Sequence, residues 1–97
     1  MKRALIAAAF LFTAADAAAD DGPCERLEFI ARTAMEARQS GIALRDAIEA
    51  AGGDSLIVAM VKEAYSKPIV FDPTLRRLAI NEFAGSIYLW CLNEVAE

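Results

Sequence analysis

Two cysteines, Cys24 and Cys91, constrain the fold of this chain more than any other residues. They are the only cysteines among 97 residues, so a single intramolecular bond can join them. That bond would close a loop of about 67 residues and stabilise the fold by about 4 kcal/mol in the chain-entropy model. Such a stabilisation is comparable to the whole net stability of a small domain. Because so short a chain buries only a modest core, the sequence predicts a disulfide-bridged domain.

Residues 1–19 have the layout of a secretory signal peptide. Lys2 and Arg3 form a positive start, residues 4–12 are apolar, and Ala17-Ala18-Ala19 ends in an Ala-x-Ala cleavage pattern. The apolar stretch is too short for a comfortable membrane span, so we expect it to be removed and to leave no membrane anchor. Export would place the protein in the periplasm or outside the cell, where the two thiols oxidise to a bridge.

The remaining residues, 20–97, are enough for a single helical domain and no more. They hold eight Lys and Arg against thirteen Asp and Glu, a net charge of −5. This balance argues against nucleic acid and anionic membranes as partners. The expected partner is another protein, and the composition leaves the oligomeric state open.

Four helices are predicted in this domain, separated by glycine and proline. Proline suits the first turn of a helix, glycine suits the position after its end, and aspartate suits the N-cap. The third helix begins with an apolar run that could form a strand, but its apolar residues recur at helical spacing. The helices are expected from Pro23 to the stop at Gly41, from Ala43 to Ala51, from the cap Asp54 to the stop at Pro68, and from Asp72 to about Glu94.

The predicted fold class is all-α, a small bundle of about four helices. Cys24 opens the first helix and Cys91 nearly closes the last, so a bridge between adjacent helices requires them to be antiparallel. Small residues at Ala31 and Ala84 would let these helices approach closely. The two middle helices are expected to cover the remaining apolar side. We expect the main buried face of the last helix to contain Leu75, Ala79, Phe83, Ile87 and Trp90.

The chain has no histidine, which removes the usual nucleophile–histidine pairs, histidine metal ligands and the common proton shuttle. No phosphate-binding loop, zinc spacing or calcium loop is present, so neither cofactor nor metal is predicted. Only carboxylates, such as Glu25 with Glu28 or Glu82 alone, are candidates for acid–base chemistry. Acidic residues on a helix usually form a solvated face, and no catalytic residue is predicted. The sequence therefore favours a protein that is not an enzyme.

Three residues are candidates for a partner-binding surface: Phe29, Arg77 and Tyr88. Phe29 lies on the polar side of the first helix, and Tyr88 lies on the side of Arg77 in the last helix. Exposed aromatic rings flanked by charges are typical of protein-binding patches. The alternative is that either ring packs under a loop or a terminus.

Several short motifs follow one another along the chain at a defined spacing: Cys24, Ala34-Met35-x-x-Arg38-Gln39-x-Gly41, Ala64-Tyr65-x-x-Pro68, Ala79-Ile80-x-x-Phe83 and Tyr88-x-x-Cys91. This spacing resembles that of a group of small secreted helical proteins encoded by proteobacteria and their phages or prophages. The group has no agreed activity, so the resemblance assigns no catalytic residue. A looser likeness, in size, export, helicity and a terminal disulfide, links the chain to periplasmic phage proteins that inhibit a tail lysozyme.

Two functions remain open from the sequence. The first is an exported interaction module of phage or prophage origin, directed at an envelope or lytic protein. The second is a periplasmic chaperone for acid or other stress, whose apolar third helix would be exposed as the fold loosens.

Overall fold

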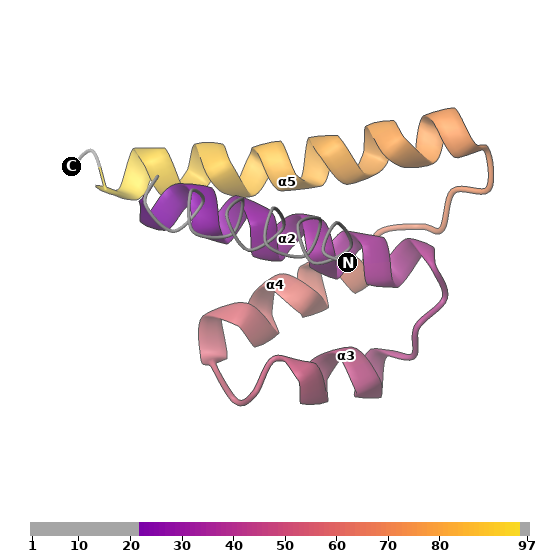
Figure 1. The fold of residues 1–97 in the computed structure, drawn as a ribbon, viewed down its shortest axis with the longest axis horizontal. Coiled ribbons are helices and arrows are strands. Elements are labelled where there is room, and N and C mark those ends of the chain that lie inside the picture. Colours follow the sequence, from indigo (N-terminus) through magenta and orange to yellow (C-terminus); the bar gives the residue numbers. More distant parts are fainter. Residues whose placement is uncertain (1–21, 96–97) are drawn as a thin grey trace, which may run out of the picture.

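The computed structural model describes residues 22–95, which form four α-helices and no strand. Figure 1 shows α2 and α5 side by side and antiparallel, which confirms the predicted fold class. The predicted signal peptide, residues 1–19, lies outside the described residues. No helix within residues 22–95 combines the length and apolarity needed to cross a membrane. The helices are α2 (Pro23–Gln39), α3 (Leu44–Ala50), α4 (Ser55–Tyr65) and α5 (Pro73–Val95).

The helix ends follow from residues that the sequence places there. Pro23 occupies the start of α2, and Gly41 follows its end with a φ of 82°, a conformation that glycine adopts readily. The Asp54 carboxylate accepts a hydrogen bond from the Ile57 amide at 3.0 Å and caps α4. The Asp72 carboxylate accepts the first free amides of α5 in the same way. Local sequence therefore determines where each of these helices begins or ends.

The predicted bridge between Cys24 and Cys91 joins the start of α2 to the end of α5, with the Cα atoms 5.4 Å apart. Both cysteines are buried. Further along the same interface, Ala31 and Ala84 have no exposed surface, which fits the close approach predicted for small residues. Bridges of this kind form and persist in oxidising compartments, outside the reducing cytoplasm.

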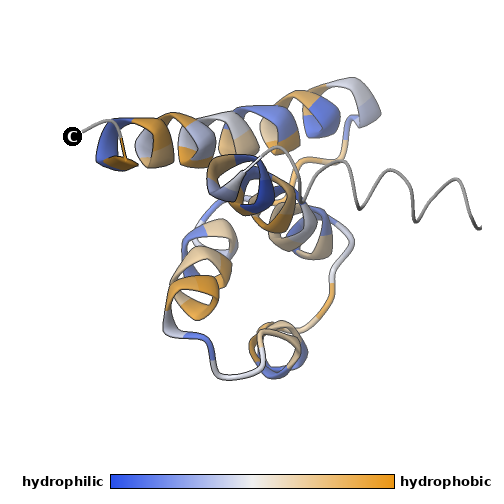
Figure 2. Ribbon diagram, turned by 60° about the vertical axis from the view of Figure 1, so that its left-hand side comes forward, coloured by the Kyte–Doolittle hydropathy of each residue, from blue (hydrophilic) through white to orange (hydrophobic). Residues whose placement is uncertain are grey.

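One expectation about α5 is wrong. Leu75 and Trp90, predicted on its main buried face, are exposed, whereas Phe83 is buried in the core. The bridge turns the Ala84–Cys91 side of α5 toward α2, and this rotation leaves Leu75 and Trp90 outside. The middle helices pack on the apolar side of α2 that α5 leaves open. Figure 2 shows α2 lying between α5 and the α3–α4 pair, so α3 and α4 cover α2 and not the outer face of α5.

The link between α4 and α5 is held by one buried polar side chain, Gln39, which is only 5% exposed. Its Nε2 donates to the carbonyl oxygen of Pro68 at 2.9 Å, and its Oε1 accepts from the amide of Val70 at 2.7 Å. The neighbouring Arg38 donates from Nε to the carbonyl oxygen of Lys67 at 2.8 Å. The last turn of α2 therefore supplies hydrogen-bond partners to an extended segment that has no helix or sheet of its own.

A second cross-link holds the loop between α2 and α3. The Tyr65 hydroxyl, at the end of α4, donates to the carbonyl oxygen of Ile42 at 2.6 Å. The Arg38 guanidinium lies over the Tyr65 ring, 5.5 Å from its centroid. Burial raises the pKa of Tyr65; Arg38 lowers it and Asp46 raises it further. Tyr65 therefore keeps its proton at neutral pH and remains a hydrogen-bond donor to this loop.

Gly85, in the middle of α5, has open space where a Cβ atom would lie, with no atom within 4 Å. Glycine in a helix interior costs about 1 kcal/mol relative to alanine. We therefore expect Gly85→Ala to raise the free energy of unfolding by about 1 kcal/mol, measured by urea denaturation at low protein concentration. If Gly85→Ala is less stable than the wild type, the space at the Cβ position of residue 85 is not open.

Candidate binding groove

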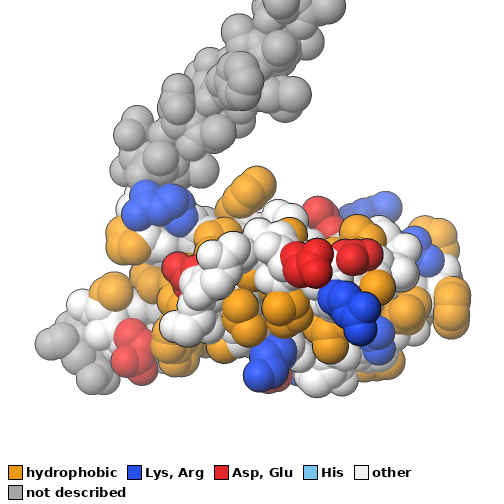
Figure 3. All heavy atoms as spheres, turned by 90° about the horizontal axis from the view of Figure 1, so that it is seen from below, with side chains coloured by type: hydrophobic (Ala, Val, Ile, Leu, Met, Phe, Trp, Pro, Cys, Tyr) orange, Lys and Arg blue, Asp and Glu red, His pale blue; other side chains and the backbone are white. Residues whose placement is uncertain are grey.

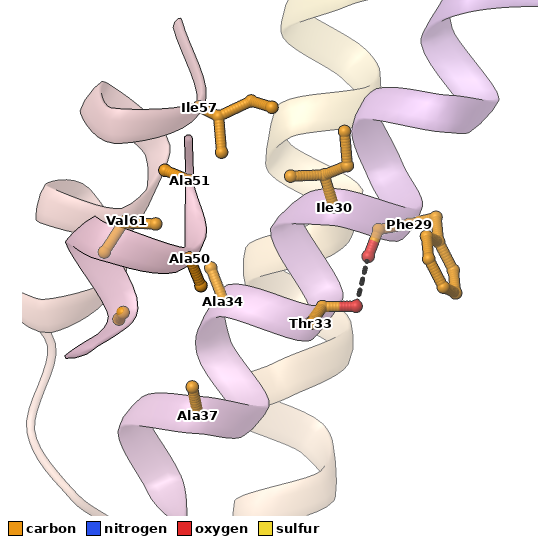
Figure 4. A pocket seen from close by; sticks show the side chains of 10 residues that line it. Phe29, Ile30, Thr33, Ala34, Ala37, Ala50, Ala51, Ile57 and Val61 are labelled. Atoms are coloured by element: carbon orange, nitrogen blue, oxygen red, sulfur yellow. Dashed lines mark hydrogen bonds between the residues drawn. The ribbon is translucent and has the colours of Figure 1, made fainter. Parts of the chain in front are cut away.

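A groove of about 260 Å³ lies between α2 and the α3–α4 pair. Figure 4 shows Ile30 and Ala34 of α2 on one side and Ala50, Ala51 and Val61 on the other. Half of the lining residues are alanines, whose short side chains leave the space between the helices unfilled. The lining residues are Phe29, Ile30, Thr33, Ala34, Ala37, Ala47, Ala50, Ala51, Ile57 and Val61.

The chemistry of the groove is apolar. None of its ten lining residues is ionisable. The one hydroxyl among them, on Thr33, donates to the backbone carbonyl oxygen of Phe29 at 3.0 Å, within α2 itself. The groove can therefore hold apolar side chains, but its own lining has no group that transfers a proton. Its volume lies just below the usual range for ligand pockets, about 300–1,000 Å³, and suits a few side chains.

Phe29 lies at the outer rim of the groove. Its ring is 62% exposed, so the alternative in which it packs under a loop or terminus does not hold for the described residues. Figure 4 shows the ring turned away from Val61 and Ala50, toward the outside of the molecule. A large exposed ring beside an apolar groove extends the apolar surface that a partner could contact.

The other two predicted surface residues lie on α5 and do not line the groove. Tyr88 is half-buried, and its hydroxyl donates to the Glu25 carboxylate at 3.1 Å, across the α2–α5 interface. Arg77 is exposed and lies eleven residues earlier on α5, about 16 Å along the helix axis. It borders a shallow polar hollow with Arg32 and Asn81, whose side chains are hydrogen-bonded to each other. The structure therefore places Tyr88 against Glu25, one helical turn before Phe29 on α2, and Arg77 beside Arg32, on the turn after Phe29.

The carboxylates considered for acid–base chemistry have structural partners or lie in solvent. Glu28 forms an ion pair with Arg32 at 3.4 Å, and Glu25 accepts the hydrogen bond from Tyr88. Glu82 is exposed on α5 and borders a second hollow, of about 280 Å³, that Lys67 also lines. Among residues 22–95, no three acidic, cysteine or histidine side chains gather closely enough to hold a metal ion. None of these carboxylates lines the apolar groove.

The groove itself was not predicted from the sequence. Residues such as Ala47 and Ala51 have the spacing of ordinary packing positions, and periodicity does not distinguish a filled contact from an empty one. The available signal is that small residues occur on facing sides of α2 and α3 with no large side chain between them. That signal becomes visible only when the positions of the helices are known.

The likeness to small secreted helical proteins of proteobacteria and their phages rests on residue spacing, and it stays a prediction. The same is true of the looser likeness to phage inhibitors of a tail lysozyme. No protein-family model, no curated protein and no solved structure matches this chain.

Proposed function

We propose that this protein is an exported, non-enzymatic binding module whose α2–α3–α4 groove takes an apolar segment of another protein. The observation that carries the proposal is a half-open groove lined only by uncharged residues, with Phe29 exposed at its rim. A partner that inserts large aliphatic or aromatic side chains would fill space that this chain leaves empty, and such anchors supply most of the binding energy in protein interfaces.

The charge around the groove favours a segment with basic flanks. Asp46 and Glu49 are exposed on α3, next to lining alanines, and Asp54 is exposed at the start of α4. Residues 20–97 carry a net charge of −5, which attracts a basic partner and accelerates the encounter. Figure 3 views the molecule from the α3 side and shows apolar side chains interspersed with acidic and basic ones. This mixture is typical of interfaces that form and dissociate.

Export accounts for the disulfide and for the layout of residues 1–19. A partner met after export would be a periplasmic, envelope or secreted protein. Inhibition of a lytic protein at the cell envelope is the form of this function that the resemblance to phage-encoded proteins suggests.

The test uses residues 20–97 with the disulfide intact and two synthetic helical peptides. Both peptides carry leucines at the same i, i+3, i+4 and i+7 positions, one with lysine and the other with glutamate elsewhere. We expect the lysine peptide to bind with a Kd on the order of 10–100 μM and the glutamate peptide to bind at least about 10-fold more weakly. In NMR titrations, amide shifts should move at the groove residues.

Filling the groove should block the lysine peptide. Ala50 lines the groove and is exposed, so Ala50→Leu should leave the fold intact and weaken peptide binding by about 10-fold or more. Ala59→Leu is the matched control, because Ala59 is also exposed on a helix but lies outside the groove. Phe29→Ala should weaken binding with little change in Tm, because the ring is mostly exposed.

If Ala50→Leu binds the lysine peptide as tightly as the wild type, or if the NMR amide shifts are centred on α5, the groove is not the binding site. Binding that appears only near pH 2–3, together with binding of a hydrophobic dye, would instead support the chaperone.

A further inference from the structure

The side of α5 that faces away from α2 carries a regular apolar pattern, which we call the outer stripe. Its members recur at alternating spacings of three and four residues, the spacing of the seam in a coiled coil. The four leucines among them are between 38% and 58% exposed. The outer stripe consists of Leu75, Leu78, Glu82, Gly85, Leu89 and Leu92.

A surface helix usually places charged residues opposite its buried face. The outer stripe has one charge, Glu82, and four exposed leucines. The positions that flank it on both sides are also uncharged. They are Thr74, Ala79, Asn81, Ser86, Tyr88 and Asn93. None of the described helices covers this side, because α5 packs on α2, and α3 and α4 lie beyond α2 (Figure 2).

The residue pattern of the outer stripe is nearly symmetric about its centre, between Glu82 and Gly85. From the ends inward it pairs Leu75 with Leu92, and then Leu78 with Leu89. The central pair of this pattern is Glu82 and Gly85. Glu82 has the longest side chain of the stripe, and Gly85 has none. A pattern with this symmetry is complementary to a second copy of itself in the antiparallel direction, as a two-fold interface requires.

We propose that two copies of this protein associate through their outer stripes, with the α5 helices antiparallel around a two-fold axis. Each Leu75 then contacts Leu92 of the second copy, and each Leu78 contacts Leu89 of the second copy. The contact extends over about 26 Å of helix. A Cβ at Gly85 would meet no neighbouring group within 4 Å, and this space receives the methylene groups of Glu82 of the second copy, whose carboxylate stays in solvent at the edge of the contact. The proposal is independent of the groove, which lies on the far side of α2.

The experiment is sedimentation equilibrium of residues 20–97 with the disulfide intact, from 5 to 500 μM, with concentrations of this order chosen to span a moderate dimer affinity. We expect the wild-type protein to form dimers with a Kd of about 1–100 μM. Leu78→Glu and Leu89→Lys, each alone, should weaken dimerisation by about 30-fold or more, because each buries an unpaired charge twice per dimer. Leu56→Lys is the control: Leu56 is exposed on α4, outside the outer stripe, and its variant should dimerise like the wild type.

The direction of the helices is tested by the double variant Leu78→Glu/Leu89→Lys. In the antiparallel arrangement each glutamate faces a lysine of the second copy, so dimerisation should return to within about 10-fold of the wild type. In a parallel arrangement like charges meet, and the double variant stays monomeric. A wild-type protein that is monomeric at 500 μM, single variants that dimerise normally, or a monomeric double variant would each overturn the proposal.

Discussion

Replacing both cysteines, Cys24→Ser with Cys91→Ser, should lower the free energy of unfolding by about 4 kcal/mol, because the bridge closes a loop of 67 residues. In a domain of this size, 1 kcal/mol shifts Tm by about 4–8 °C, so Tm should fall by roughly 15–30 °C. The measurement is thermal unfolding followed by circular dichroism. The double variant is preferred because neither thiol is left free to react.

The matched control is the wild-type protein melted in the presence of a reductant. Because the reduced protein also lacks the cross-link, its Tm should fall by nearly the same amount as that of the variant. A double-serine variant that melts within a few degrees of the oxidised wild type would show that the bridge contributes little. The helices α2 and α5 would then be held together by Ala31, Ala84 and their neighbours alone.

The second large effect is expected at Gln39. Gln39→Ala removes a buried side chain that makes two hydrogen bonds to the backbone. The carbonyl oxygen of Pro68 loses its donor, and the amide of Val70 loses its acceptor. Leaving a buried polar group unpaired costs about 1–3 kcal/mol, and the two backbone groups are only partly buried, so the free energy of unfolding of the variant should fall by about 1–2 kcal/mol in urea denaturation. Because the link before α5 loses these hydrogen bonds, it should open more often. We therefore also expect faster amide hydrogen exchange at residues 69–71.

Gln39→Glu separates the two hydrogen bonds. An ionised glutamate still accepts from the Val70 amide but no longer donates to Pro68, and it places a charge in a buried position. Its stability should therefore fall at neutral pH and recover as the pH drops below about 4, where a protonated carboxyl donates again. If both variants are as stable as the wild type, the link between α4 and α5 is held by other contacts.

The two proposals concern opposite sides of the α2–α5 pair. If both hold, the dimer carries two apolar grooves. A partner with two suitable segments, or a partner repeated on a surface, would then bind more tightly than one groove allows, without any new contact. The Leu78 and Leu89 variants separate the two effects, since each should weaken the dimer and leave the affinity of a single groove for the lysine peptide unchanged.

The positions of the helices and the direction of the first and last could be predicted from the sequence. Pro23, Gly41, Asp54 and Asp72 act on the residues next to them, so their effect needs no knowledge of the rest of the chain. The bridge is also readable from the sequence, since two cysteines admit one pairing. The burial of Phe83 followed from helical spacing as well.

The sequence by itself therefore determined the four helices, most of their boundaries and the antiparallel pairing of α2 with α5, because these depend on neighbouring residues and on one covalent bond; α4 ends at Tyr65, before the stop expected at Pro68. Only the tertiary structure decided which side of α5 is covered, since apolar residues occur on more than one face and the face that periodicity favours is rotated from the one that packs on α2. The exposure of Leu75 and Trp90, the alanine-lined groove and the hydrogen bonds of Gln39 depend on the rotation and position of whole helices. These are set by the sum of many weak contacts between residues far apart in the chain, which no local pattern records.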